Sequence, residues 1–157
     1  MTTIKIGDQA PDFALPAHDG TTFTSASLRD RQPLVLFFYP ADETPICTKE
    51  ACAFRDAYAE FVAAGAAVVG ISSDYLNSHK KFAAGHQISY PLLSDADGLV
   101  RALFGVPKTF GLFPGRVTYI IDREGIVRHI YDSQLFPERH VAEALTVVKR
   151  LSQPSAK

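Results

Sequence analysis

A continuous apolar run at residues 34–39 constrains the fold of this chain more than any other feature. The run Leu-Val-Leu-Phe-Phe-Tyr does not alternate with polar residues and stops at Pro40, which is typical of a strand buried on both faces of a sheet. After Thr44 the apolar residues recur every three or four positions, and a second apolar run follows at residues 67–72. This order predicts a right-handed βαβ unit, with Thr44 as the N-cap and Pro45 as the first helical residue.

The rest of the chain predicts shorter elements. In order they are a helix over 78–84, an extended segment over 91–94, a helix capped by Asp95 and ended by Gly105, a hairpin of strands 117–122 and 126–131, and a last helix whose apolar face carries Val141, Leu145, Val148 and Leu151. We therefore expect one α/β domain over residues 1–157, with a flexible tail at 152–157. Its order predicts a thioredoxin-like arrangement, in which a central mixed sheet has helices on both faces.

Charge and hydropathy exclude several classes of protein. Sixteen Lys and Arg against seventeen Asp and Glu give a net charge of −1, which argues against a nucleic-acid binder. The longest apolar stretches, 34–39 and 61–71, are shorter than the roughly 18 residues that span a bilayer. The amino-terminal residues have no apolar core, so we expect no signal peptide and a cytoplasmic location. In a reducing compartment, two cysteines indicate a catalytic or metal-binding pair rather than a disulfide scaffold.

Cys47 falls in the first turn of the helix that follows the central strand. Unpaired backbone N–H groups and the positive end of the helix dipole stabilise a thiolate at such a position. Open α/β sheets also place their sites just beyond the carboxyl ends of strands. The alternative is that Cys47, four residues before Ala51 on the apolar face, only fills space in the core.

Cys52 lies about 140° around the same helix from Cys47, given 100° per residue. The two Cα atoms would be about 8.6 Å apart, beyond the limit of about 7 Å for a disulfide without backbone movement. A bond between the two cysteines therefore requires the helix to unwind. A zinc site completed by His79 and His86 is a further alternative, although six intervening residues exceed the usual spacing of structural zinc ligands.

Several ordered motifs resemble the peroxiredoxin family. Pro40-x-x-x-Thr44-x-x-Cys47 resembles the active-site signature of that family, and residues 48–56 resemble its continuation in the bacterioferritin comigratory protein, or peroxiredoxin Q, branch. Further similar segments lie at residues 7–13, 78–82, 90–95 and 115–122. The resemblance spans nearly the whole chain and is far more specific than any one motif.

The resemblance implies an activity and a set of site residues. Cys47 would attack a peroxide as a thiolate and become a sulfenic acid, and Cys52 would resolve it as an intramolecular disulfide that thioredoxin or a similar dithiol reduces. Arg116 would supply positive charge, Thr44 a hydrogen bond to sulfur and peroxide besides its helix cap, and Pro40 a shield against water. No organic cofactor or metal is implied, and the chain would be a monomer or a weak homodimer.

Other residues near the motif have open roles. Glu50 and Arg55 are expected either to contact and hold the side chains that surround the thiol or to be solvated charges on the helix surface. Tyr39 either lines the pocket or belongs to the core. Ile46 stands where this branch usually has glycine, which is expected to stiffen the start of the helix, and the segment Phe113-Pro114-Gly115 is expected to reshape the rim of the pocket.

Two other activities remain open on the same fold. A thiol–disulfide oxidoreductase is disfavoured, because such enzymes carry C-x-x-C rather than the C-x4-C of this chain. A peroxide sensor or chaperone would be oxidised once, without turnover driven by thioredoxin.

Oxidation to a Cys47–Cys52 disulfide should open the helix that carries both residues, because an intact helix holds them too far apart. Amide hydrogen exchange should become faster over residues 44–56, while the strands at 34–39 and 117–122 stay protected. Equal protection of residues 44–56 in the reduced and oxidised proteins would show that this disulfide does not form or that the segment is not helical.

Overall fold

A five-stranded mixed sheet forms the centre of the structure, a computed structural model that describes residues 4–106 and 115–152. The strands, in their order across the sheet, are β5 (Leu92–Ser94), β4 (Ala67–Ser72), β3 (Leu34–Phe38), β6 (Val117–Ile121) and β7 (Val127–Asp132). Strands β3, β4 and β5 are parallel to one another, while β6 pairs antiparallel with both β3 and β7. The central position of β3 explains why its sequence is apolar without alternation.

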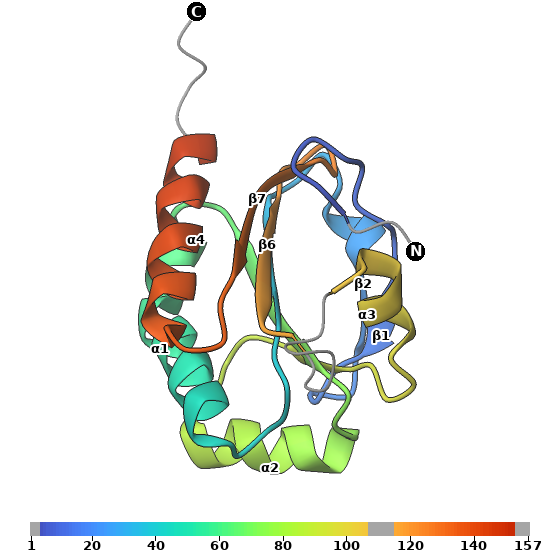
Figure 1. Cartoon of the computed structure of the whole chain (residues 1–157), viewed down its shortest axis with the longest axis vertical. Coiled ribbons are helices and arrows are strands. Elements are labelled where there is room, and N and C mark those ends of the chain that lie inside the picture. The colour runs from blue at the N-terminus through green and yellow to red at the C-terminus, as the bar shows by residue number, and fades with distance from the viewer. Residues whose placement is uncertain (1–3, 107–114, 153–157) are drawn as a thin grey trace, which may run out of the picture.

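Helices cover both faces of this sheet, as the sequence predicts (Figure 1). Helices α1 (Pro45–Ala63) and α4 (Pro137–Ser152) lie on one face, and α3 (Leu99–Phe104) lies on the other with the hairpin of β1 (Ala14–Pro16) and β2 (Thr22–Thr24) and the short 3-10 helix η1 (Ser25–Leu28). Helix α2 (Leu76–His86) lies at the end of the sheet where α1 begins. In the part of the chain that the structure describes, no helix is both long and apolar enough to cross a membrane.

Alternate residues of β3 build two separate cores. Phe37 faces α1 and stacks on Phe54, with ring centroids 4.3 Å apart and planes 10° apart. Phe38 faces the other side and packs against Phe104 and Tyr119. Burying an aromatic side chain of this size contributes about 1.5–3 kcal/mol, so both faces of β3 stabilise the fold.

The predicted βαβ unit is confirmed, with β3 and β4 in parallel register from Leu34 opposite Ala67. The predicted helix over 78–84 was too short, because α2 runs from Leu76 to His86. The residue that follows it, Gln87, has a left-handed backbone although it is not glycine. Strands β1 and β2 were not predicted, since three residues are too few to show a period. Ser152 belongs to α4, and the rest of the predicted tail, residues 153–157, lies outside the described residues.

Asp95 caps α3 as predicted, although not from the N-cap position. Its carboxylate accepts hydrogen bonds from the backbone N–H groups of Val100 at 3.1 Å and Arg101 at 2.9 Å. The N-cap residue itself is Gly98, which has a left-handed backbone. A side chain three residues further back therefore satisfies the N–H groups of the first turn.

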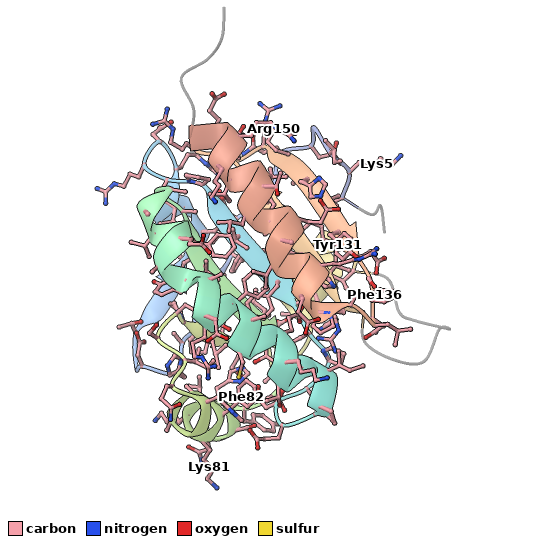
Figure 2. All side chains as sticks on the ribbon, turned by 90° about the vertical axis from the view of Figure 1, so that its left-hand side faces the viewer. Lys5, Lys81, Phe82, Tyr131, Phe136 and Arg150 are labelled. Carbon is pink, nitrogen blue, oxygen red and sulfur yellow. The ribbon has the colours of Figure 1, made fainter. Side chains whose placement is uncertain are left out.

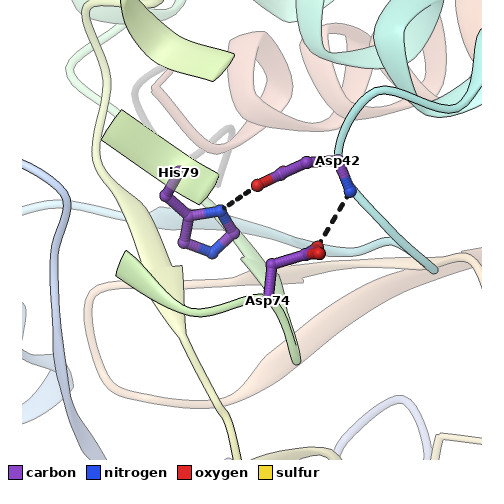
Figure 3. Close-up of side chains that lie close together, drawn as sticks. All are labelled: Asp42, Asp74 and His79. Carbon is purple, nitrogen blue, oxygen red and sulfur yellow. Dashed lines mark hydrogen bonds and ion pairs between the residues drawn. The ribbon is translucent and has the colours of Figure 1, made fainter. Parts of the chain in front are cut away.

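A buried ion pair anchors the loop between β3 and α1 (Figure 3). His79 is fully buried, and its Nδ1 lies 2.7 Å from the Asp42 carboxylate while its Nε2 lies 2.9 Å from the Leu93 carbonyl oxygen. Because both ring nitrogens face oxygen acceptors, the ring donates from both and is positively charged. The pair therefore joins α2 to the loop that precedes α1.

Other donors complete the environment of Asp42. The hydroxyl groups of Tyr39 and Ser78 donate to its two carboxylate oxygens at 2.7 and 2.8 Å, and its own backbone N–H donates to Asp74 at 2.8 Å. Burial raises the pKa of Asp42, but the hydrogen bond and charge of His79 and the two hydroxyl donors outweigh it, so the pKa lies below its ordinary value. The loop is thereby fixed to α2 and to the end of β5.

Asp42→Asn should destabilise the protein by about 3–5 kcal/mol, because it leaves the buried His79 without its counter-charge. Urea unfolding measures the loss, and Asp56→Asn, in an exposed pair with Arg55, should cost less than about 1 kcal/mol. The folded pKa of Asp42 is depressed, so its contribution is present above its ordinary pKa of 3.8 and is lost as the pH falls through the folded value. An Asp42→Asn variant as stable as the wild type would contradict this role.

Candidate active site

Cys47 lies in the first turn of α1 and is 1% exposed. The helix begins at Pro45 after Thr44, as the sequence predicts, and the carbonyl oxygen of Thr44 accepts the backbone N–H of Thr48 at 2.8 Å. The predicted side-chain cap is wrong, because the Thr44 hydroxyl donates instead to the Ala41 carbonyl oxygen at 3.0 Å. The Thr44 hydroxyl therefore does not occupy the N–H groups of the first turn that surround Cys47.

Arg116 reaches Cys47 from the neighbouring strand. It directly precedes β6, and the antiparallel pairing of Phe38 with Val117 brings the start of β6 to the end of β3 from which α1 departs. Its Nη2 donates to the Cys47 Sγ at 3.1 Å, and the residue is 2% exposed. A buried guanidinium at this distance stabilises negative charge on the sulfur.

Glu50 is the second partner of Arg116. Its Oε1 accepts from Arg116 Nη1 at 2.7 Å, and the side chain is fully buried one turn after Cys47, so the expectation of a solvated charge is wrong. Burial raises the pKa of Glu50 to about 7, although the charge and hydrogen bond of Arg116 lower it. Arg55, by contrast, is partly exposed and joins α1 to the carbonyl oxygen of His86, away from the thiol.

A cavity of about 470 Å³ opens in front of the thiol. Its lining is mostly apolar and comprises Pro40, Thr44, Pro45, Ile46, Cys47, Arg116 and Gln134. The half-buried Ile46 thus adds an apolar side chain to the wall of the cavity. Gly115 is buried beside Arg116, while Phe113 and Pro114, which we expect to shape the rim, lie outside the described residues.

Four of the five predicted site residues therefore meet at one cavity, and Cys52 does not line it. Cys52 is half-buried on the same unbroken helix, and both cysteines are free thiols. Tyr39 also lies away from the cavity, where it is buried and donates its hydroxyl hydrogen bond to Asp42.

Arg101 supports the site and was missed by the sequence analysis. Its two terminal nitrogens donate to the carbonyl oxygens of Tyr39 and Gly115, each at 3.0 Å, and its guanidinium lies 5.5 Å from the centre of the Phe38 ring. It therefore ties together the two segments that carry Pro40 and Arg116. In the sequence, an arginine within a short helix is indistinguishable from a surface charge, so no pattern indicated the role of Arg101.

The structure does not support the zinc alternative. His79 is held by Asp42 and by the Leu93 carbonyl oxygen, and His86 Nε2 lies 3.0 Å from Glu43. Among the described residues, the one group with metal-ligand spacing is Asp42, Asp74 and His79, which includes neither cysteine. The close oxygen and nitrogen atoms of that group already accept or donate hydrogen bonds within the protein.

Known proteins are similar to this chain in sequence and in structure. The AhpC/TSA family pattern matches residues 6–130. Chloroplastic peroxiredoxin Q of Triticum aestivum is 47% identical over 149 residues, which cover 94% of this chain and 68% of the relative. A crystal structure of peroxidoxin BcpB from Mycobacterium tuberculosis superimposes with a TM-score of 0.86 at 42% identity, covering 94% of this chain and 98% of the other.

The bacterioferritin comigratory protein of Xanthomonas campestris, whose alkyl peroxide reduction activity has been studied structurally, gives a TM-score of 0.84 at 29% identity. The similarity covers 96% of this chain and 98% of that protein. The fold is therefore shared with known peroxiredoxins. The chain belongs to the AhpC/TSA family of peroxiredoxins, in its peroxiredoxin Q branch.

Proposed function

We propose that this peroxiredoxin Q reduces peroxides with Cys47 as the nucleophile. The observation that carries the proposal is the 3.1 Å contact of the Arg116 guanidinium with the Cys47 Sγ beside an open cavity. A nucleophilic thiol reacts as the thiolate, and a buried cation stabilises that form. The same cation lies where negative charge develops as the peroxide bond breaks.

The first step converts the thiolate to a sulfenic acid. The Cys47 sulfur attacks the terminal oxygen of the peroxide, the S–O bond forms as the O–O bond breaks, and the leaving oxygen takes up a proton as water or an alcohol. Arg116 lines the cavity beside the sulfur, so its guanidinium is placed to stabilise the charge that develops on the departing oxygen. Thr44 and Pro40 line the same cavity, and in this proposal Thr44 contacts the peroxide while Pro40 shields the sulfur from water.

The second step forms an intramolecular disulfide. The Cys52 thiolate attacks the sulfenic sulfur of Cys47, and the hydroxyl group leaves as water after protonation. The first turns of α1 must open for this attack, because the helix holds the two cysteines too far apart. A dithiol reductant such as thioredoxin then restores both thiols.

The cavity favours a range of peroxides. Its mostly apolar lining accommodates an alkyl chain, and the similar Xanthomonas campestris protein has alkyl peroxide reduction activity. We therefore assign both hydrogen peroxide and organic hydroperoxides as substrates. A bulky protein disulfide would not reach a cysteine that is 1% exposed, which disfavours a thiol–disulfide oxidoreductase.

The cell compartment and the assembly are further parts of the proposal. We expect a cytoplasmic location because the amino-terminal residues do not resemble a signal peptide, whereas the wheat relative is named as chloroplastic. The chain is expected to work as a monomer or a weak homodimer.

Peroxide consumption coupled to thioredoxin and its reductase tests these roles. Cys47→Ser should abolish turnover, and Arg116→Ala should lower kcat/KM for peroxide by about 10²–10³-fold, because a transition-state contact is lost. The matched control is Arg128→Ala, which removes a partly exposed arginine paired with Asp122 and should leave the rate unchanged. A tenth of wild-type activity in Cys47→Ser would rule out Cys47 as the nucleophile.

Cys52→Ser separates the two steps in the same assay. It should keep the first reaction with peroxide and lose turnover with thioredoxin. A wild-type protein that reduces one equivalent of peroxide and then stops would indicate a sensor.

A further inference from the structure

A group of buried polar side chains lies behind Arg116, and the peroxide reaction described above does not use it. Glu50 of α1, Thr118 of β6 and His140 of α4 are each at most 1% exposed. They meet where α1 and α4 lie side by side over the sheet, close to the start of α4 that Phe136 marks in Figure 2. Buried polar groups are normally fully hydrogen-bonded, so each atom of this group can be examined in turn.

His140 is a neutral ring with a hydrogen-bond acceptor directed into the group. Its Nε2 lies 2.7 Å from the Ser133 carbonyl oxygen and must carry a proton to donate there. Burial lowers the pKa of His140 to about 4, although the hydrogen bond to Ser133 raises it, and the charge of Arg116 lowers it further. Nδ1 therefore carries no proton, and it accepts a hydrogen bond from the Thr118 hydroxyl at 2.7 Å.

Glu50 places an unsatisfied oxygen beside that nitrogen. Its Oε1 is paired with Arg116, but in the part of the chain that the structure describes its buried Oε2 has no hydrogen-bond partner. Oε2 lies 3.4 Å from the His140 Nδ1. A carboxylate oxygen and a ring lone pair this close repel each other, and a proton on Oε2 removes that repulsion while Nδ1 keeps its bond from Thr118.

We propose that Glu50 and His140 together hold one exchangeable proton, and that this proton sets how strongly Arg116 acts on the Cys47 sulfur. The proposal rests on the proposed role of Cys47. When the proton is absent, the Glu50 carboxylate competes with the sulfur for the same guanidinium. When the pair takes a proton from solvent, Glu50 is neutral and the charge of Arg116 faces the sulfur alone. Glu50 and His140 are thus positioning residues that act through Arg116.

The other groups around the pair keep their charge near neutral pH. Arg116 is always protonated, and the buried Tyr90, which faces Glu50, has a pKa well above its ordinary value because of burial and the negative charge of Glu50. The ring of Tyr131 meets His140 edge-on, with centroids 4.7 Å apart. Among these neighbours, the pair itself is therefore the group that changes charge near neutral pH.

NMR titration of the glutamate side-chain carboxyl groups tests the proton directly and does not depend on turnover. Glu50, assigned by the loss of its signal in Glu50→Gln, should titrate near neutral pH in the wild type. His140→Leu removes the acceptor and should move that titration at least about one pH unit lower. A Glu50 that stays ionised from acid to neutral pH in the wild type overturns the proposal, even if His140→Leu does not fold.

The rate of Cys47 alkylation by iodoacetamide, followed against pH, tests the effect on the sulfur. Glu50→Gln keeps a hydrogen-bonding side chain but removes the competing charge, so the profile should move to lower pH. His140→Leu should move it to higher pH in the wild type and should have no effect in the Glu50→Gln background. Glu60→Gln, an exposed carboxylate of the same helix paired with Lys149, is the control and should leave the profile in place.

A His140→Leu shift that is equally large in both backgrounds would show that His140 does not act through Glu50. The proposed function fails on a different result, the survival of peroxide turnover in Cys47→Ser. The two failures are therefore distinguishable.

Discussion

One buried guanidinium organises the site of this protein. Arg116 binds the Cys47 sulfur through one terminal nitrogen and Glu50 through the other, in surroundings that are almost free of solvent. Electrostatic interactions are much stronger in such surroundings than in water, so a change in the charge of one partner alters how strongly Arg116 binds the other. We propose that the reactivity of the thiol depends on both partners of Arg116 and, through Glu50, on His140, whose Nδ1 lies 3.4 Å from the Glu50 carboxylate.

The fold brings Cys47 and Arg116 together at one end of the central strand. Strand β3 is buried on both faces. Helix α1 follows the end of β3 and carries Cys47, and the start of β6 lies opposite that end and places Arg116 beside it. The loop between β3 and α1 is fixed by the Asp42–His79 pair, and Arg101 links that loop to the segment before β6. Helix α1, which the proposed disulfide requires to open, thus starts from an anchored loop.

The sequence predicts local features well and long-range polar contacts poorly. The apolar run at 34–39 and the helical spacing after Thr44 were enough to place Cys47 at a helix start, because both signals are local. The role of Glu50 was left open and the buried role of His79 was not predicted, since both depend on partners that are 66 and 37 residues away in the chain. Neither composition nor periodicity predicts a contact between residues so far apart in the chain. The buried roles of His140 and Arg101 were not predicted for the same reason.

Trapping of a sulfenic acid tests the central claim most directly. The Cys52→Ser variant is treated with one equivalent of peroxide in the presence of dimedone, which reacts with sulfenic acids, and the adduct is located by mass spectrometry. Our account predicts a stoichiometric adduct at Cys47 that forms much more slowly when Arg116 is also replaced by alanine. Consumption of the peroxide while Cys47 remains a free, unlabelled thiol would contradict it.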